Sequence, residues 1–378
     1  MLTEFFSQNP ILFSVLAALA FATFIQLIFY WGVFSRVAFF RPKNDYARND
    51  EPVSIIVCAR NEYRNLSENL PYLLNQDYGN YEVVVVDHGS DDDTSYLLRD
   101  LQLDYRHLKV VSMTQDLNFF TGKKFPLSIG IKSASHDILL LTDADCIPRS
   151  NQWLRRITSN FTFGTEIVLG YGAYERSNNL LNQFIRFDTL RVAMQYFGLA
   201  LSGMPYMGVG RNMAYRKSLF YRQNGFISHY RIQTGDDDLF VNRAANRRNT
   251  RVEFHPDSHT LSSPKKTFTD WFRQKKRHLQ SGYHYRFRHK LALGFLGSSQ
   301  ALYYASFIVL LSFWYMPYLV MGMAGIRLIS QLFIFSKTMR KLSEKGFLLL
   351  VPFFEVFILL INPLISLSNL FNKPVKWR

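Results

Sequence analysis

The N-terminal apolar stretch constrains the fold of this chain most strongly. Residues Phe5–Ser35 contain no Asp, Glu, Lys or Arg, and ~20 consecutive apolar residues in a helix suffice to cross a bilayer. A cleavable signal peptide would begin with basic residues and have a shorter apolar core, whereas Glu4 precedes this stretch and Arg36 follows it. We therefore expect residues 1–36 to form an uncleaved transmembrane anchor, with the N-terminus outside and Arg36 onward in the cytoplasm.

Two more apolar regions lie near the C-terminus. Residues 291–336 can hold two spans that turn near residues 315–317, and the basic residues 337–345 that follow are expected in the cytoplasm. Residues 347–371 are apolar except for Glu355. A full span there would carry the basic C-terminal tail outside, so we expect this third segment to be re-entrant or interfacial, with a spanning helix as the alternative.

Arg327 and Glu355 are ionisable residues inside these C-terminal regions. Such residues are costly at membrane depth and tend to pair. Counted from the ends of their segments at ~1.5 Å per residue, both lie ~12–14 Å from the same membrane face. We therefore predict an Arg327–Glu355 ion pair, the alternative being that Arg327 extends to the far interface.

The basic character of the chain agrees better with a membrane protein than with a nucleic-acid-binding protein. The formal net charge is +15, but the Lys and Arg residues cluster at the edges of the apolar tracts, as expected for a cytoplasmic membrane face. A smaller share could serve a diphosphate substrate. The two cysteines, Cys58 and Cys146, lie in or just after predicted strands and are expected to be core residues of a reduced protein.

Between the apolar ends, predicted strands and helices alternate. Strands are predicted at residues 53–58, 81–86, 108–112 and 138–141, and helices at 65–75, 93–103 and 125–135. This alternation is typical of a doubly wound α/β fold with a parallel sheet. No Gly-x-Gly-x-x-Gly motif opens the first helix, so the phosphate loop of a dinucleotide-binding fold is absent from the sequence.

Polar residues follow several of the predicted strands. The apolar run Leu139–Ile147 reads as a buried strand and contains Asp143 and Asp145 near its end. Ligands of open α/β sheets bind beyond the carboxyl ends of the strands, and paired carboxylates suit Mg²⁺ or Mn²⁺ held together with substrate phosphates. The alternative is a solvated turn. Similar clusters follow the first two strands, at residues 59–62 and 87–94, although Ser90 or Asp91 could simply cap the next helix.

These residues resemble glycosyltransferase family 2, the inverting GT-A enzymes that include cellulose, chitin and hyaluronan synthases. The resemblance spans roughly residues 53–282 and implies a GT-A fold with a mixed doubly wound sheet. It implies that the nucleotide-sugar donor contacts four features: the end of the first strand, an aspartate that recognises the nucleotide base, a lysine near the donor, and the first carboxylate of the Asp-x-Asp motif. In this sequence the corresponding residues are Ala59, Asn61, Glu62, Asp87, Lys123 or Lys124, and Asp143. Asp145 corresponds to the metal-binding aspartate, and His88 stands where many members carry a second aspartate.

The resemblance also assigns an acceptor side. Residues 208–216 are similar to the family's acceptor segment, in which Gly210 and Asn212 would lie near the acceptor. Three adjacent carboxylates, Asp236–Asp238, repel one another, which raises the pKa of at least one of them, as a general base requires. By similarity Asp237 is the base and Asp236 the second candidate, while the structural alternative is an exposed acidic helix cap.

Residues 267–282 are predicted to form one amphipathic helix. Phe268, Trp271, Phe272 and Leu279 share one face, and Gln274, Arg277 and Ser281 lie roughly opposite. This pattern is typical of an interfacial helix with a polar face over an active site. Gln274 and Arg277 resemble the Gln-x-x-Arg-Trp signature of membrane-integrated synthases, in which Arg binds the donor diphosphate. His278 replaces the Trp that stacks under the acceptor. Residues 178–200 are a second amphipathic stretch that could lie against the membrane.

Taken together, the resemblance implies a membrane-bound inverting glycosyltransferase of a bacterial-type inner or plasma membrane. Its catalytic domain, residues 50–266, would face the cytoplasm, followed by the interfacial helix at 267–290. The expected partners are the bilayer, a UDP-linked sugar donor with Mg²⁺ or Mn²⁺, and a lipid-linked or growing glycan acceptor, with no nucleic acid. The alternatives are a processive polysaccharide synthase that translocates its polymer and a catalytically silent nucleotide-binding scaffold.

Overall fold

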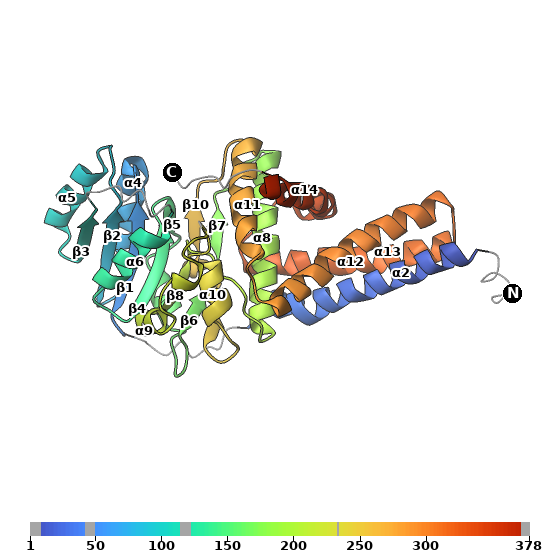
Figure 1. The fold of residues 1–378 in the computed structure, drawn as a ribbon, viewed down its shortest axis with the longest axis horizontal. Coiled ribbons are helices and arrows are strands. Elements are labelled where there is room, and N and C mark those ends of the chain that lie inside the picture. The colour runs from blue at the N-terminus through green and yellow to red at the C-terminus, as the bar shows by residue number, and fades with distance from the viewer. Residues whose placement is uncertain (1–8, 42–49, 114–121, 233, 372–378) are drawn as a thin grey trace.

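The computed structural model describes residues 9–41, 50–113, 122–232 and 234–371. An α/β domain occupies one end of the molecule, and a bundle of long helices extends from it (Figure 1). The α/β domain contains strands and α-helices and, in addition, two short 3₁₀ helices at Ile227–His229 and Pro256–Ser258.

A seven-stranded mixed sheet forms the centre of the α/β domain. The strand order is β3-β2-β1-β4-β8-β6-β9, and β3, β2, β1 and β4 are mutually parallel, whereas β8 is antiparallel to both β4 and β6. The strands are β1 Val53–Ala59, β2 Tyr81–Asp87, β3 Leu108–Ser112, β4 Ile138–Asp143, β6 Ile167–Leu169, β8 Met213–Arg216 and β9 Thr250–Val252. Helices cover both faces, which explains the continuous apolar runs of the central strands. The predicted mixed GT-A sheet is confirmed.

The helices of this domain follow the predicted alternation closely. The structure has α4 Tyr63–Leu74, α5 Thr94–Asp104, α6 Lys124–Ser133, α7 Trp153–Thr158, α9 Lys217–Arg222 and α10 Asp238–Ala244. Helices α4, α5 and α6 correspond to the helices predicted at residues 65–75, 93–103 and 125–135. Their ends differ by one or two residues, which is the usual uncertainty of helix boundaries.

A small second sheet changes the prediction for residues 139–147. Its order is β5-β10-β7, with β5 Cys146–Pro148, β7 Gly172–Tyr174 and β10 Thr260–Ser262. The apolar stretch is therefore two strands, because β4 ends at Asp143 and the chain turns through Ala144 and Asp145 into β5. Both carboxylates consequently lie where the two sheets meet.

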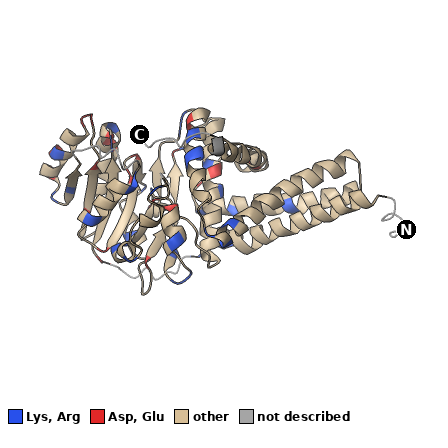
Figure 2. Ribbon diagram, in the orientation of Figure 1, with Lys and Arg blue, Asp and Glu red and all other residues tan. Residues whose placement is uncertain are grey.

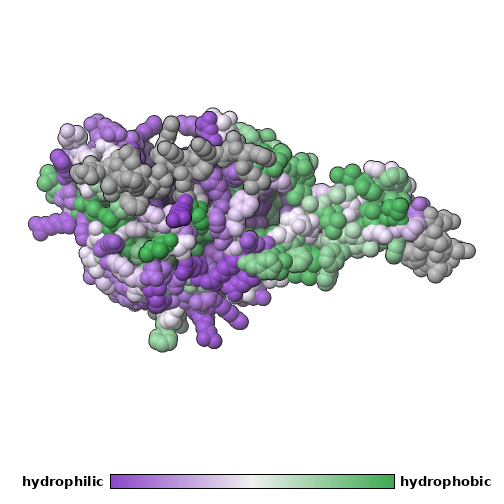
Figure 3. Space-filling view, in the orientation of Figure 1, coloured by the Kyte–Doolittle hydropathy of each residue, from purple (hydrophilic) through white to green (hydrophobic). Residues whose placement is uncertain are grey.

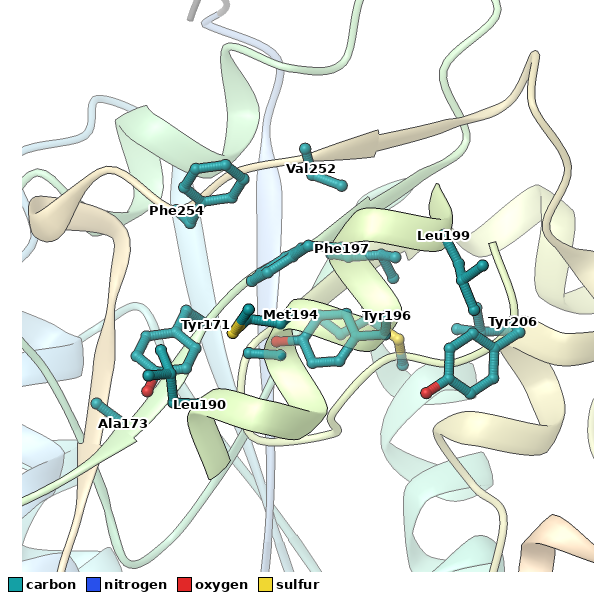
Figure 4. Close-up of a cluster of buried hydrophobic side chains, with 14 of the residues drawn as sticks. Tyr171, Ala173, Leu190, Met194, Tyr196, Phe197, Leu199, Tyr206, Val252 and Phe254 are labelled. Carbon is teal, nitrogen blue, oxygen red and sulfur yellow. The ribbon is translucent and has the colours of Figure 1, made fainter. Parts of the chain in front are cut away.

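Helix α8, Leu180–Leu201, lies between the α/β domain and the apolar helices. The helix was predicted, but its predicted position against the membrane is corrected by its burial. It packs against β7 and β9 on one side and against the N-terminal helix and α14 on the other. Figure 4 shows its residues Leu190, Met194 and Phe197 within a cluster of buried side chains.

Among the residues that the structure describes, four helices are long and apolar enough to cross a membrane. The N-terminal one runs through α2 Pro10–Ile28, a π-helical turn Phe29–Phe34 and α3 Ser35–Ala38, and the next two are α12 Phe287–Ser312 and α13 Pro317–Lys341. These three lie side by side, and their outer part carries few charged residues (Figures 1 and 2). Their surface is mostly hydrophobic, in contrast to the α/β domain (Figure 3). The predicted turn at 315–317 is confirmed, since Met316 lies between α12 and α13 with φ 44°.

The fourth apolar helix, α14 Val351–Phe371, follows a 3₁₀ turn at Leu348–Leu350 and packs differently. It lies against α8 and against α11 Phe268–Gly282, and it runs across the direction of the other three rather than along it (Figure 1). The interfacial or re-entrant position of this segment in a membrane stays a prediction.

The predicted Arg327–Glu355 ion pair is present. Arg327 is 2% exposed and Glu355 5% exposed, and the guanidinium donates directly to the Glu355 carboxylate. Three more donors reach that carboxylate: Tyr304 Oη at 2.7 Å, Gln300 Nε2 at 2.8 Å and Tyr30 Oη at 3.3 Å. The pair thus joins α13 to α14 and connects both to α2–α3 and α12.

Candidate functional site

A cavity of about 1300 Å³ lies where the α/β domain, α11 and the apolar helices meet. Carboxylates line one end of it, and residues of α12 and α14 line the other. Among the predicted site residues, those that line this cavity are Glu62, Lys123, Asp143, Asp145, Gly210, Asp236, Asp237, Gln274, Arg277 and His278. The fold therefore gathers most of the predicted site from six different segments of the chain.

Asp143 and Asp145 lie at the turn between β4 and β5. Burial alone would raise the pKa of Asp143, but Lys123, whose ammonium donates to the Asp143 carboxylate, lowers it. Burial and the neighbouring charge of Asp143 raise the pKa of Asp145. Both carboxylates are half-buried, and among the described residues only Asp143 has a cationic partner. The pair fits a divalent cation, since such a cation would remove the repulsion between Asp143 and Asp145.

Cys146 lies close to the same two carboxylates, within 4.8 Å of their oxygens. Burial raises the pKa of its thiol, and its Sγ lies 3.0 Å from Ser262 Oγ. Thiolate is a soft ligand that suits softer metals than Mg²⁺ or Mn²⁺. The oxygen donors at this position match the preference of Mg²⁺ and Mn²⁺. Both Cys58 and Cys146 are buried and unbridged.

Asp237 lies at the start of α10 and faces the cavity. Its Oδ2 accepts a hydrogen bond from the Gly210 amide at 2.8 Å, and its Oδ1 accepts one from the Asp238 amide at 2.7 Å. Burial, followed by repulsion from Asp236 and Asp238, raises the pKa of Asp237 to about 8. The residue is both a helix cap, which was the structural alternative, and a carboxyl whose pKa suits proton transfer near neutral pH.

Asp238 connects this loop to α11 and was not predicted as a site residue. Its Oδ2 accepts a hydrogen bond from Tyr285 Oη at 2.7 Å and another from Ser281 Oγ. The carboxylate therefore holds the loop that carries Asp236 and Asp237 against the end of α11. Sequence reasoning assigned Ser281 to the polar face of that helix, but the pairing with Asp238 depends on tertiary packing.

Helix α11 presents its polar face to the cavity, as predicted. Thr267 caps the helix by accepting from the Asp270 amide at 3.1 Å. Gln274 and Arg277 line the cavity, and His278 opens onto it with a pKa lowered to about 3 by desolvation and by Arg277, so its imidazole is neutral. The apolar face differs from the prediction, because Trp271 packs against Phe184 of α8 at a ring distance of 4.8 Å and is buried in protein.

Arg211 is a further cation of the cavity lining that the sequence did not single out. Its guanidinium lies 4.3 Å from the centre of the Tyr174 ring and donates to the Gly172 carbonyl at 2.6 Å. Gln274 Nε2 donates to the Tyr174 hydroxyl at 3.1 Å. Arg211 lies in the predicted acceptor segment, and its position among small residues was the available signal.

Three predicted donor residues, Ala59, Asn61 and Asp87, lie at the same sheet edge but do not line the cavity. Ala59 is the buried last residue of β1, paired with Asp87 of β2. Asn61 Oδ1 accepts from the Asp91 amide at 2.8 Å, and the buried Asp87 carboxylate accepts from Ser90 Oγ at 2.6 Å. Their side chains therefore stabilise the turns after the two strands in this structure.

Of the two candidates for the lysine near the donor, Lys123 and Lys124, the structure favours Lys123. Lys124 does not line the cavity; its Nζ donates to the carbonyls of His229, Ile232 and Thr234, and desolvation lowers its pKa to about 8. Lys124 thus holds the loop that precedes Asp236. Only Lys123 of this pair lines the cavity.

Asn212 is a correction to the predicted acceptor residues. It is fully buried, its Oδ1 accepts from Trp153 Nε1 at 3.1 Å, and its Nδ2 donates to the carbonyls of Tyr171 and Ser258 at 2.8 Å. A side chain whose polar atoms are all engaged inside the domain is not exposed to a substrate. Gly210 does line the cavity, and a Cβ there would lie 3.4 Å from Asp237 Oδ2.

Comparison with known proteins identifies the family. The family described as "Glycosyltransferase like family 2" matches residues 51–281, which is more than half of the chain. The chain therefore belongs to this family of glycosyltransferases, in agreement with the sequence resemblance.

Individual relatives match over shorter lengths. Glycosyltransferase AglE of Haloferax volcanii is 33% identical over 191 residues, covering 49% of this chain and 58% of that protein. The poly-beta-1,6-N-acetyl-D-glucosamine synthase of Staphylococcus epidermidis is 27% identical over 132 residues, covering 32% of this chain and 31% of the synthase. This chain thus spans 58% of the length of AglE and 31% of the length of the synthase.

Among solved structures, the mannosyltransferase PcManGT from Pyrobaculum calidifontis, in complex with GDP-Man and Mn²⁺, has a similar fold. The TM-score is 0.58 at 21% sequence identity, and the match covers 89% of this chain and all of that chain. This similarity supports the fold.

Proposed function

We propose that this protein is a membrane-bound inverting glycosyltransferase that transfers a sugar from a nucleoside diphosphate sugar to a lipid-linked acceptor. The observation that carries the proposal is the continuity of the cavity. One end holds Asp143, Asp145, Asp237 and Arg277, and the other lies between α12 and α14. A polar reaction site and an apolar channel thus share one space.

The donor diphosphate is proposed to bind at the carboxylate end. Asp145, with Asp143 beside it, would hold Mg²⁺ or Mn²⁺, which supplies charge neutralisation of the departing diphosphate. Arg277 and Lys123 are the nearby cations that would stabilise the same negative charge. The resemblance favours a UDP-linked sugar, and a GDP-linked sugar is the alternative that the solved complex of PcManGT brings in.

Asp237 is proposed as the general base. Its carboxylate would take the proton of the acceptor hydroxyl while that oxygen bonds to the anomeric carbon and the bond from that carbon to the diphosphate breaks. A single displacement of this kind inverts the anomeric configuration. The Gly210 amide fixes the orientation of the carboxylate, and Asp238 fixes the loop through Tyr285. Asp236 remains the second candidate for the base.

The apolar end of the cavity supports a lipid-linked acceptor. Small and apolar residues line it on both helices: Leu293, Gly294, Gly297, Ala301 and Ala305 of α12, and Ile358, Leu359 and Pro363 of α14. A Cβ added at Gly294 or Gly297 would meet no atom within 4 Å. The cavity therefore has room for an aliphatic chain beside α12, and burial of such a chain stabilises its complex by roughly 0.8 kcal/mol per CH₂.

The membrane topology is proposed from the charge distribution. The basic residues that border α3, α12 and α13 support a cytoplasmic position of the α/β domain. The domain divisions proposed are an anchor at residues 1–36, the catalytic domain at 50–266, the interfacial helix at 267–290, a hairpin at 291–336 and the transverse segment at 347–371. The transverse packing of α14 supports the interfacial position of that last segment.

The acceptor proposal is tested by filling the apolar end of the cavity. Gly297→Trp should block transfer to lipid while leaving the affinity for the donor unchanged, because Gly297 lies on α12, which carries none of the proposed donor residues. Gly322→Trp is the matched control, since a Cβ at Gly322 also meets nothing within 4 Å but the residue is exposed on α13 and does not line the cavity.

The measurement is the incorporation of labelled sugar from a nucleotide sugar into material extracted by organic solvent from membranes that contain each variant. Labelled lipid product with the wild type and Gly322→Trp, and its loss with Gly297→Trp, supports the proposal. Labelled product of high molecular weight that remains in the aqueous phase would instead favour a processive synthase, the reading that the Staphylococcus epidermidis relative brings in.

A further inference from the structure

A second crevice lies where the C-terminal end of α13 meets the α/β domain. Its volume is about 500 Å³. The lining residues are Arg149, Arg176, Ser336, Met339, Arg340, Ser343, Glu344, Lys345 and Leu348. None of them lines the active-site cavity, so the crevice is a separate feature of the described part of the chain.

Four basic side chains surround this crevice. Arg149 follows β5 and Arg176 follows β7, whereas Arg340 and Lys345 flank the turn after α13, and all four residues are exposed. Arg176 donates to the carbonyl of Ser343, which fixes one guanidinium at the rim. Across the described ranges, none of the four forms an ion pair with a carboxylate.

The acidic residue of the lining does not offset this charge, because it is already paired. Glu344 Oε2 accepts from Arg186 Nε at 2.9 Å, and its Oε1 accepts from Tyr171 Oη at 3.1 Å. Arg186 and Glu344 are both buried. The crevice is therefore a concave, accessible surface with an excess of positive charge.

The position of the crevice points to the membrane surface. Helix α13 is one of the helices apolar enough to cross a membrane, and Lys341 is its last residue. The next apolar element begins at Leu348, and Leu349 is 77% exposed. The four cations thus lie at the depth where a membrane-spanning helix ends, next to exposed apolar side chains. Anionic headgroups occupy this level, and nearby Lys and Arg side chains attract them.

We propose that this crevice binds the phosphate headgroup of an anionic glycerophospholipid from the leaflet on the side of the α/β domain. The phosphate would lie among Arg149, Arg340 and Lys345, with the acyl chains passing along Met339 and Leu348. Because the same turn carries Glu344, which holds Arg186 of α8 and Tyr171, occupancy stabilises the junction between the membrane helices and the catalytic domain.

The proposal is tested with the full-length protein in mixed micelles of a neutral detergent. Phosphatidylglycerol and phosphatidylcholine are titrated separately while the melting temperature is recorded, and retained lipid is identified by native mass spectrometry. We expect phosphatidylglycerol, but not phosphatidylcholine, to raise the melting temperature and to stay bound. Arg340→Gln/Lys345→Gln should weaken its apparent affinity by about 30-fold, which corresponds to about 2 kcal/mol at ~1 kcal/mol per cation.

Two further variants separate a built site from general charge attraction. Arg99→Gln/Arg106→Gln removes two exposed cations from α5 and the turn after it, at the far end of the domain, and should keep the wild-type affinity. Arg340→Lys/Lys345→Arg keeps both charges and should also bind, which shows that the turn tolerates substitution.

Three results would overturn the proposal. An equal loss of affinity in Arg99→Gln/Arg106→Gln would mean that net charge alone attracts the lipid. An equal rise in melting temperature with inorganic phosphate would make the crevice a site for a soluble anion. Unchanged affinity in Arg340→Gln/Lys345→Gln would place the lipid elsewhere.

Discussion

Disruption of the buried Arg327–Glu355 pair should be among the most destabilising changes in the apolar helices. Glu355→Gln keeps the size of the side chain but removes the charge that faces the Arg327 guanidinium. Loss of one partner of a buried pair costs ~3–5 kcal/mol, because the other charge stays buried without compensation. Arg327→Met should have a cost of the same order, since three uncharged donors then surround an uncompensated carboxylate.

The double variant Arg327→Met/Glu355→Gln should cost less than the sum of the two single variants, by roughly 1–3 kcal/mol, because neither charge is then left alone. The free energy of unfolding is measured for all four proteins in mixed micelles with rising denaturing detergent. Arg64 and Glu68 provide a matched control cycle, because their pair lies on the surface with side chains 87% and 64% exposed. Its coupling should not exceed ~0.5 kcal/mol.

The refuting result is additivity. If the destabilisations at Arg327 and Glu355 add to within ~0.5 kcal/mol, the two residues do not stabilise each other in the membrane, and the contact between α13 and α14 has another basis. A double variant as stable as the wild type would, in contrast, agree with the account, since apolar or neutral replacements often substitute for a buried ion pair.

Four predictions concern the carboxylate end of the cavity. Asp145→Asn should remove the part of UDP binding that depends on Mn²⁺ while the melting temperature changes little, and calorimetry showing unchanged affinity with Mn²⁺ would contradict the metal assignment. Asp237→Asn should keep donor affinity and lose turnover by ~10²-fold or more; an active Asp237→Asn with an inactive Asp236→Asn would move the base one residue earlier. Because burial raises the pKa of Asp237 to about 8, the folded protein retains a proton that the unfolded chain releases near pH 3.8, so this carboxyl lowers stability as pH rises between those values. The melting temperature of the metal-free wild type should therefore fall relative to Asp237→Asn over that range, and parallel pH curves would refute the shift. Arg277→Ala should weaken UDP much more than uridine, whereas equal losses would show that Arg277 acts on the fold.

The parts of the fold that could be predicted are those whose sequence pattern is local. Strands β1, β2 and β4 are buried on both faces, so each is a continuous apolar run. Strands β6, β7, β9 and β10 have three residues each, too few to show a period, and they exist because distant segments pair with them. Helix α8 mixes apolar and polar residues, and only its burial on both sides distinguishes it from a helix on a membrane surface.

The same division applies to the candidate site. Asp143, Asp145, Asp237 and Arg277 belong to contiguous motifs, and the fold gathers them in one cavity. Asn212 also belongs to a motif, but its amide bonds to carbonyls 41 and 46 residues away, which no local pattern shows.

The site residues that the sequence did not predict owe their positions to contacts between different helices and strands. Arg211 faces the cavity because Tyr174 of β7 lies beneath its guanidinium, and Asp238 matters because Tyr285 reaches it from beyond α11. Neither partner is close in sequence. Recognition of such residues therefore requires knowledge of which helices and strands meet.

The most direct test of the proposed activity is the release of nucleotide by the purified protein. The protein in nanodiscs that contain a total lipid extract is incubated with Mn²⁺ and, separately, with a panel of UDP- and GDP-linked sugars, and free UDP or GDP is quantified. We expect release from one nucleotide sugar that depends on Mn²⁺ and lipid and falls by ~10²-fold in Asp237→Asn. An exposed-carboxylate control, Asp100→Asn, should keep the wild-type rate. Binding of a nucleotide sugar without release from any member of the panel, in the wild type as in Asp237→Asn, would contradict catalysis and favour a nucleotide-binding scaffold.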